Sequence, residues 1–423
     1  MPRVLVIRYE GQPFLVRMSK LLRTMLDSGW QVDVLIPRGG LGATNVSKEM
    51  GRDLTGEVTL LEFPHELPRT IPERLLYRLS GTGFFGSSEF RRYLTGLLSR
   101  QKYDLIWAKD TPILPAVFHA IKRSGHPPVR VVCDMYENIT EQVYDTFVRY
   151  GKLYERLLTQ ASLLISRLRR AERLYLARCD HIFVVVDTAK TFLVKRYGLE
   201  PSRITVVHNV EILSDFDRIE PGQPLLDTDV PLISFVGGFG PHRGIDTLLE
   251  AVALLVSRGE TRFRLALVGA SGSELARLES VCRERGLQEV VVLRGYLSHR
   301  EAMRWMKQSN IGVIPHVNTP QIRTTIPNKL FQYMAAGVPC IVSDVGPLGR
   351  IVRQTGCGLT FPAGNAPELA ARIADLLAHP EQMLELGRNG RASVERQYRW
   401  EIEGQEYARY LLGVMSAIQD VSK

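Results

Sequence analysis

Short apolar runs rich in β-branched residues alternate with segments of helical periodicity along almost the whole chain. Near the N-terminus, Val4–Ile7 predicts a strand, and apolar residues at helical spacing over 18–26 predict a helix that stops at Gly29. Further strands are expected at Val32–Ile36, Leu105–Trp107, Val129–Cys133, Ile182–Val186 and Ile204–Val207. Strands separated by helices form parallel sheets with right-handed crossovers, so the pattern predicts an α/β protein.

The alternation breaks once. Residues 214–230 carry Asp, Pro and Gly without periodicity, which is typical of a linker between domains. Beyond the break, strands are expected at Leu232–Val236, Leu265–Val268, Val290–Leu293, Ile311–Ile314 and Cys340–Val342. Because 423 residues are enough for two or three domains, we expect two doubly wound halves that face each other.

Composition excludes several classes of protein. With 45% hydrophobic and 23% charged residues, the chain has the balance of a globular protein. Five widely spaced cysteines favour buried free thiols in a reducing compartment, and neither they nor the nine histidines show the spacing of a metal site. The N-terminal apolar run is too short for a signal peptide, and no apolar stretch reaches about 18 residues. We therefore expect a cytoplasmic protein, either soluble or peripheral on a membrane.

The sharpest local feature is the glycine-rich segment 235–244, Phe-Val-Gly-Gly-Phe-Gly-Pro-His-Arg-Gly, between a predicted strand and a predicted helix. Glycines let backbone N–H groups approach a ligand, the start of the helix at Ile245 adds a partial positive charge, and Arg243 adds a full one. An anion, most simply a phosphate, fits this place. A tight strand-to-helix turn with a solvated Arg243 is the alternative reading.

A second segment, residues 324–337, carries polar side chains at the start of a predicted helix. Pro327 and Asn328 suit a helix start and Gly337 suits its end. Lys329 and Gln332 are three residues apart, so they point from one face of the first turn. A cation and an amide there fit a diphosphate and a sugar hydroxyl, whereas an ordinary amphipathic helix with a solvated Lys329 is the alternative.

Together the two segments resemble the donor domain of the retaining glycosyltransferases of family 4, which have the GT-B fold of two Rossmann-like domains with a cleft between them. Weaker matches lie at residues 29–32, 207–210 and 398–401. The resemblance implies an acceptor domain over 1–213, a linker over 214–230, a nucleotide-sugar domain over 231–395, and a C-terminal helix over 396–423 that packs back on the first domain.

The resemblance also implies an activity. A sugar, of the hexosyl type, is transferred from a nucleoside-diphosphate donor to a glycan or lipid-linked acceptor with retention, without metal or cofactor, in the synthesis of cell-surface polysaccharide or glycoconjugate. Arg243 and Lys329 would stabilise the departing diphosphate. The other donor-binding residues implied are Gly237, Gly238 and Gly240 for the diphosphate, Thr325, Asn328 and Gln332 for phosphate, ribose or sugar, and Gly295 and Tyr296 for the base.

Several positions depart from the family pattern. The Glu-x7-Glu pair of the family falls on Thr324 and Gln332, and its frequent first-loop Arg falls on Gly238. Histidines of the acceptor domain correspond to Lys109 and Tyr136, which leaves Asp110 and Glu137 as the polar groups expected at the reacting centre. Because both carboxylates of the pair are missing, a GT-B nucleotide-sugar epimerase and a non-catalytic scaffold stay open as alternatives.

The net charge of +9 is concentrated in two segments, residues 66–102 and 149–178. Arg91, Arg92 and Arg100 flank an apolar face over 90–98, which fits peripheral contact with an anionic membrane through residues 74–100 and 149–178. A core-facing helix with a solvated basic side is the alternative. No recognition motif accompanies the charge, so a nucleic-acid partner is not expected.

Overall fold

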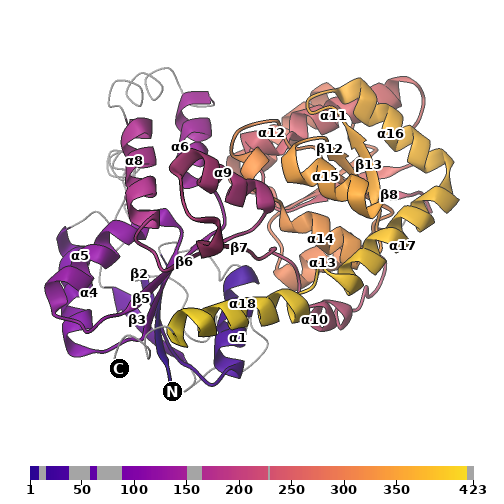
Figure 1. The fold of residues 1–423 in the computed structure, drawn as a ribbon. Coiled ribbons are helices and arrows are strands. Elements are labelled where there is room, and N and C mark those ends of the chain that lie inside the picture. The colour runs from indigo at the N-terminus through magenta and orange to yellow at the C-terminus, as the bar shows by residue number, and fades with distance from the viewer. Residues whose placement is uncertain (9–15, 38–57, 64–87, 150–163, 227–228, 417–423) are drawn as a thin grey trace. The chain divides into compact units, whose positions relative to one another are not determined.

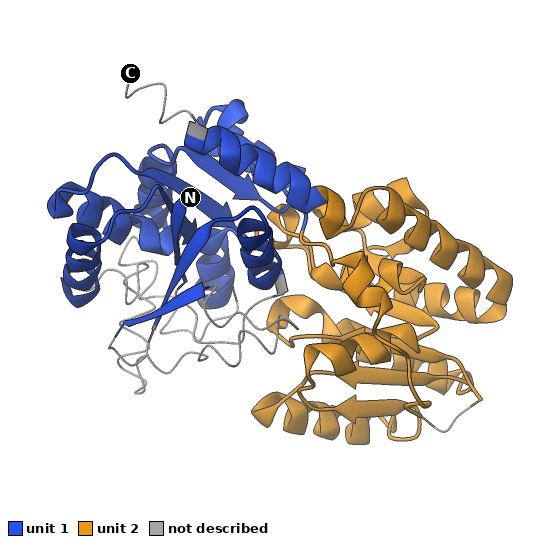
Figure 2. Ribbon diagram, turned by 90° about the horizontal axis from the view of Figure 1, so that it is seen from below, with its two compact units in different colours: residues 1–208, 403–423 blue, residues 209–402 orange. Residues whose placement is uncertain are grey.

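The computed structural model describes residues 1–8, 16–37, 58–63, 88–149, 164–226 and 229–416 (Figure 1). The chain forms two compact units, one of Met1–His208 with Glu403–Lys423 and one of Asn209–Ile402 (Figure 2). Each unit contains one sheet in which all strands are parallel. The predicted α/β class with two doubly wound, Rossmann-like sheets is confirmed.

Unit 1 is built on a seven-stranded sheet of order β3-β2-β1-β4-β5-β6-β7. Its strands are β1 (Arg3–Ile7), β2 (Gln31–Pro37), β3 (Val58–Phe63), β4 (Leu105–Lys109), β5 (Arg130–Met135), β6 (His181–Val184) and β7 (Ile204–Val206). Its helices are α1 (Val16–Asp27), α4 (Ser88–Arg100), α5 (Leu114–Ser124), α6 (Ile139–Tyr144), α8 (Leu164–Leu176) and α9 (Asp187–Tyr197), with the short turns η2 (Thr111–Ile113), η3 (Asp145–Arg149) and η4 (Pro201–Arg203).

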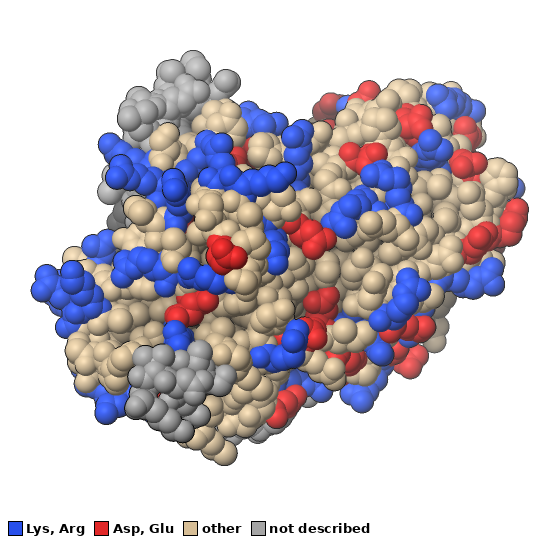
Figure 3. All heavy atoms as spheres, in the orientation of Figure 1, with Lys and Arg blue, Asp and Glu red and all other residues tan. Residues whose placement is uncertain are grey.

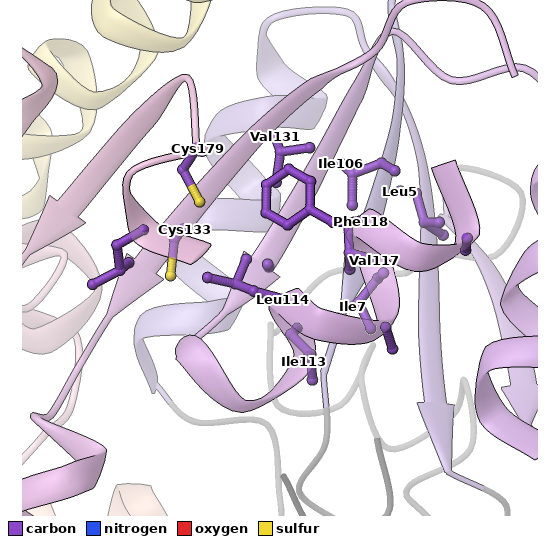
Figure 4. Close-up of a cluster of buried hydrophobic side chains, with 14 of the residues drawn as sticks. Leu5, Ile7, Ile106, Ile113, Leu114, Val117, Phe118, Val131, Cys133 and Cys179 are labelled. Carbon is purple, nitrogen blue, oxygen red and sulfur yellow. The ribbon is translucent and has the colours of Figure 1, made fainter. Parts of the chain in front are cut away.

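The core of unit 1 lies where strand side chains meet α4 and α5. Leu5, Ile106 and Val131 project from three neighbouring strands toward Val117 and Phe118 of α5 (Figure 4). All five cysteines of the chain are buried and free, as their spacing predicts. The apolar face of α4 is part of this core, through Phe90, Leu94, Leu97 and Leu98.

The burial of that face corrects one expectation. The apolar residues of 90–98 pack in the core of unit 1, so the prediction that this face dips into a membrane is wrong, whereas headgroup contact through the basic side of α4 stays a prediction. The reason is that helical periodicity identifies an apolar face without identifying what covers it. Residues 74–87 and 150–163 of the two basic segments lie outside the described residues. No helix in the described ranges is both long and apolar enough to cross a bilayer.

Unit 2 is built on a six-stranded sheet of order β10-β9-β8-β11-β12-β13. Its strands are β8 (Leu232–Val236), β9 (Arg264–Val268), β10 (Val291–Arg294), β11 (Ile311–Ile314), β12 (Cys340–Ser343) and β13 (Gly358–Phe361). Its helices are α10 (Leu213–Asp217), α11 (Ile245–Ser257), α12 (Gly272–Glu284), α13 (His299–Lys307), α14 (Asn328–Ala335), α15 (Gly346–Thr355), α16 (Ala366–Ala378) and α17 (Pro380–Arg396), with the turns η5 (Pro241–Arg243) and η6 (Ile322–Thr324).

The chain passes between the units twice, at His208–Asn209 and at Ile402–Glu403. Residues 214–230, expected to form the linker, therefore lie inside unit 2, and their first residues belong to α10. The last helix, α18 (Trp400–Ser416), begins in unit 2 and continues in unit 1. In unit 1, Tyr407 is fully buried and its ring lies 4.4 Å from that of Phe183 in β6. The final helix thus completes the core around β6.

Candidate functional site

The sheet of unit 2 reverses its winding at β8. From β8 the chain builds outward through β9 and β10, and then returns to place β11 on the other side of β8. Open α/β sheets bind ligands at the carboxyl ends of strands where this reversal occurs. The glycine-rich loop 237–244 follows β8, and the loop 315–327 before α14 follows β11. The two predicted segments therefore start from the same edge of the sheet, at the reversal.

Lys329, in the first turn of α14, reaches across to β8. Its Nζ lies 3.4 Å from the centre of the Phe235 ring, a cation–π contact. Gly237 has a φ of 130°, and a Cβ there would lie 3.1 Å from the same nitrogen. The side chain is buried, and no described residue offers its Nζ a hydrogen-bond partner. Burial, reinforced by the nearby Arg243 charge, lowers the pKa of Lys329 well below its ordinary value.

Arg243, at the end of η5, points at a buried histidine. Its Nη1 donates to Nε2 of His316, at 3.2 Å. Burial is the main cause that lowers the pKa of His316 well below 6.5, and Arg243, Lys329 and His242 add to it. Burial also lowers the pKa of His242 to about 4, again with contributions from Arg243 and Lys329. Both imidazoles are therefore neutral at pH 7.

The backbone on both sides of this group is tightly held. Gly244 has a φ of +70°, and a Cβ there would lie 1.7 Å from the carbonyl oxygen of Pro315. Only glycine allows this approach. The amide of Val317 also donates to the carbonyl of His242, at 3.1 Å. The loop after β8 is thus fixed against the loop after β11, with Arg243 on one and His316 on the other.

We call Lys329, Arg243, His242 and His316 the basic cluster. Every charged group that shifts the pKa of Lys329, His242 or His316 among the described residues is basic. A buried ammonium without a counter-charge costs several kcal/mol in general, and an anion in contact with it removes that cost. The arrangement can therefore bind an anion, with backbone N–H groups of the glycine-rich loop and the N-terminus of α14 as further donors.

Two residues of α14 that were predicted to bind a ligand form hydrogen bonds with other residues of the protein. Oδ1 of Asn328 accepts from Nδ2 of Asn209, and Nε2 of Gln332 donates to Oε1 of Glu211, both at 2.6 Å. Glu211 is buried, and its backbone carbonyl accepts from the amide of Trp400. Asn328 and Gln332 thus hold the segment 209–211 against α14. Their contacts with a ligand stay a prediction, and Glu211 joins them as a residue that the sequence did not single out.

The remaining predicted residues of unit 2 lie at the same edge of the sheet. Gly238 has open space around it, whereas a Cβ on Gly240 would lie 3.1 Å from Cε1 of His242. Thr325 is buried just before α14. Gly295 and Tyr296 follow β10, which β9 separates from β8, and the Tyr296 side chain is 71% exposed. Thr325 is therefore on the β11 side of the edge and Tyr296 on its far side.

Unit 1 has its own reversal, between β1 and β4, and Asp110 directly follows β4. Asp110 has a φ of 58°, and it is the one non-glycine residue with a positive φ in the part of the chain that the structure describes. Its Oδ1 accepts from the amide of Tyr136, and its Oδ2 lies 3.8 Å from Nζ of Lys109. Backbone strain of this kind collects at functional sites. Glu137, the second predicted residue, is half-buried next to Tyr136.

A buried ion pair lies beside Asp110, and sequence reasoning missed it. Arg17 of α1 donates to both carboxylate oxygens of Asp134, at 3.0 and 3.3 Å, and also to the backbone carbonyl of Val207. The guanidinium lies 5.3 Å from the centre of the Tyr136 ring. Arg17 and Asp134 are fully buried. This pair fixes the start of α1 and the end of β7 around the carboxyl end of β5.

Both halves of the chain are similar to known protein families. Residues 15–210 match the family described as glycosyl transferase 4-like domain, and residues 217–393 match the glycosyl transferases group 1. D-inositol 3-phosphate glycosyltransferase 2 of Catenulispora acidiphila is 29% identical over 225 residues, 50% of this chain and 51% of that relative. The match of Streptomyces bingchenggensis D-inositol 3-phosphate glycosyltransferase is also 29% identical. The chain spans about half the length of the curated relatives it matches.

Solved structures share the whole fold. Sucrose-phosphate synthase of Thermosynechococcus elongatus superposes with a TM-score of 0.76 at 19% identity, over 99% of this chain and 100% of that one. HepE of Anabaena, in complex with UDP-glucose, superposes with a TM-score of 0.69 at 14% identity, over 97% and 99%. At these identities the likeness concerns the fold. With both halves matched in order and the fold shared throughout, the chain belongs to the group 1 glycosyltransferases of family 4, which have the GT-B fold.

Proposed function

We propose that the protein transfers a sugar from a nucleoside-diphosphate donor to a glycan or lipid-linked acceptor, with retention and without a metal ion. The basic cluster is the observation that carries the proposal, because Lys329 is buried beside Arg243 and no described residue offers its Nζ a hydrogen bond. A ligand with more than one negative charge would favour the protonated form of Lys329 and pair with Arg243 as well. A diphosphate is such a ligand. The solved structures of HepE with UDP and UDP-glucose support this donor class.

The chemistry follows from where charge develops. As the bond between the anomeric carbon and the diphosphate oxygen breaks, the diphosphate gains negative charge. Lys329, Arg243 and the N-terminus of α14 are held in place before the reaction, so they stabilise this charge without reorganisation. The acceptor oxygen then forms the new bond on the face that the diphosphate leaves, and a diphosphate oxygen receives the proton of the hydroxyl. Such a step needs no nucleophile from the protein.

Unit 1 supplies the acceptor side in this proposal. Asp110 is our choice for a contact with the acceptor hydroxyl, with Glu137 beside it, because strain at Asp110 marks the reversal of the first sheet. The curated relatives are named for D-inositol 3-phosphate, so a small phosphorylated polyol is the second acceptor class to test. We place the activity in the cytoplasm, since buried free thiols fit a reducing compartment.

The experiment that tests the donor site measures thermal stability with UDP, GDP, dTDP and NAD, for the wild type, Lys329→Met and Arg258→Met. Arg258 is an exposed cation of the same unit and serves as the matched control. A ligand at 100 times its Kd adds about 2.7 kcal/mol of stability. We expect one nucleoside diphosphate to stabilise the wild type and Arg258→Met but not Lys329→Met.

Turnover of the matching nucleotide sugar distinguishes the alternatives. We expect transfer in the wild type and a loss of at least about 100-fold in kcat for Lys329→Met, as for removal of one preorganised electrostatic group. An isomerised nucleotide sugar without acceptor would identify an epimerase. Nucleotide binding with neither product would identify a scaffold, and no binding at all would reject the donor site.

A further inference from the structure

His316 lies on the loop after β11, and its side chain makes one hydrogen bond to the described residues, to Arg243 on the loop after β8. It follows β11 and Pro315, its side chain is fully buried, and its Nε2 lies 3.2 Å from Nη1 of Arg243. A guanidinium donates hydrogen bonds and accepts none. Nε2 must therefore present its lone pair to Arg243, and the ring proton of the neutral imidazole must sit on Nδ1.

The surroundings keep this tautomer in place. Arg243 from η5, Lys329 from α14 and His242 from the glycine-rich loop all face the ring, and each disfavours a second proton on it. Nδ1 is buried, and no described residue offers it a hydrogen-bond partner. The ring therefore acts as an acceptor toward Arg243 and has one buried N–H left for an acceptor that a ligand brings.

The backbone around the contact leaves little freedom to either partner. Gly244 touches the carbonyl of Pro315, and the amide of Val317 donates to the carbonyl of His242. Arg243 is half-buried, so its long side chain has many orientations to lose unless something fixes it. The imidazole of His316 is one group that holds its Nη1.

From this arrangement we propose that His316 is a positioning residue: it orients the Arg243 guanidinium toward the diphosphate of the donor. The proposal rests on the proposed function, because it takes the basic cluster as the diphosphate site. His316 acts through Arg243, and its effect on binding must therefore depend on the presence of Arg243.

The test uses UDP, GDP and dTDP binding by calorimetry, with the full chain, and continues with the nucleotide that binds. His316→Gln places a carbonyl oxygen near the position of Nε2, so it keeps the acceptor. His316→Asn is too short to do so, and His316→Leu has no acceptor. A hydrogen bond to a charged group is worth about 10- to 100-fold in affinity. We expect Asn and Leu to lose at least about 10-fold, and Gln to stay within about 3-fold of the wild type.

A double-mutant cycle separates positioning from a general effect on the fold. In an Arg243→Met background, His316→Asn should change the affinity by less than about 2-fold, because the group that it orients is gone. Equal losses in both backgrounds would overturn the proposal, as would full affinity in His316→Asn and His316→Leu. If the wild type binds no nucleoside diphosphate, the proposed function fails first and the cycle is not reached. Should His316→Leu not fold, the polar Asn and Gln pair carries the comparison.

Discussion

The Lys329 side chain is buried, and no residue in the described part of the chain offers its Nζ a hydrogen bond, so burial makes its protonated form costly. Contact with the face of Phe235 returns part of the hydration energy, but a ring quadrupole does not replace a counter-charge. The residue therefore lowers the stability of the empty protein. A ligand that supplies negative charge removes this loss of stability. At position 329, the same side chain that strengthens ligand binding therefore lowers the stability of the ligand-free protein.

Replacing Lys329 by Met should accordingly stabilise the empty protein at pH 7, by about 1–3 kcal/mol. The folded pKa of Lys329 lies below the unfolded value of 10.5, so at pH values between the two the unfolded chain binds more protons than the folded one. The loss of stability that burial of the Lys329 charge causes is largest below the folded pKa and disappears as the pH rises through 10.5. Urea unfolding of wild type and Lys329→Met at pH 7 and pH 10 measures it.

The same titration contains its own check. The stability gap between the two proteins should narrow from pH 7 to pH 10, while Arg258→Met, which removes an exposed cation, should show no such trend. A Lys329→Met variant that is less stable than the wild type at pH 7 would show that the ammonium has a counter-charge in the folded protein.

The helix α14 is held by a segment far away in sequence. Gln332 and Asn328 each make a side-chain hydrogen bond to the segment 209–211, one to Glu211 and one to Asn209. The family pattern has a carboxylate at position 332, whereas this chain has one on the opposite partner, Glu211. The contact between positions 211 and 332 thus joins one carboxylate, Glu211, and one amide, Gln332. It depends on a neutral side chain at position 332.

Changing Gln332 to Glu should destabilise unit 2 at pH 7, by on the order of 2–4 kcal/mol, since it buries two carboxylates against each other. Like charges raise the folded pKa of such a pair, so the defect should shrink as the pH falls to 5. Urea unfolding at both pH values gives the result. The exchanged pair Glu211→Gln with Gln332→Glu restores one amide and one carboxylate and should recover most of the loss. Full stability of Gln332→Glu alone at pH 7 would contradict the contact.

Apolar runs were enough to predict most strands of the two sheets, but β3 and β13 escaped. β3 is an edge strand whose residues are mostly half-buried or exposed, so it lacks a continuous apolar run. β13 opens with Gly358, where a Cβ would lie 1.9 Å from the carbonyl oxygen of Cys340. Close approach to β12 thus requires a residue that sequence patterns associate with turns.

Local motifs predict only part of the candidate site. Arg243 and Lys329 lie in segments with recognisable spacing, and the sheet brings those segments to one edge. His316, Glu211 and Arg17 have no such motif, because their partners are 73, 121 and 117 residues away in sequence. Contacts at those separations follow from strand order, which the alternation of strands and helices does not specify.

At the scale of the whole molecule, positive charge is unevenly distributed. Lys and Arg side chains gather over the part of unit 1 that contains α8 (Figure 3). Arg167, Arg170 and Arg173 of α8 are exposed. Leu174, which follows Arg173, is also exposed, at 55%. This surface, rather than α4, is where we now expect contact with an anionic membrane.

Vesicle sedimentation checks this expectation. Each arginine near an anionic surface contributes about 1 kcal/mol, so changing Arg167, Arg170 and Arg173 to Glu should weaken binding to phosphatidylserine vesicles by at least about 100-fold. The matched control changes Arg258, Arg283 and Arg285, exposed arginines of unit 2, to Glu. Equal binding of both variants, or equal binding of the wild type to phosphatidylcholine vesicles, would rule out α8 as the membrane surface.

The double passage of the chain between the units has a consequence for synthesis on the ribosome. Unit 1 includes Glu403–Lys423, and Tyr407 and Leu411 of that stretch are buried in it. These residues leave the ribosome only after the whole of unit 2 has been made. Unit 2 is continuous and can close as soon as it emerges, whereas unit 1, although begun first, must wait with an uncovered patch around Phe183. The order of translation is thus the reverse of the order in which the two units can be completed, and nascent unit 1 is the species that a chaperone would meet.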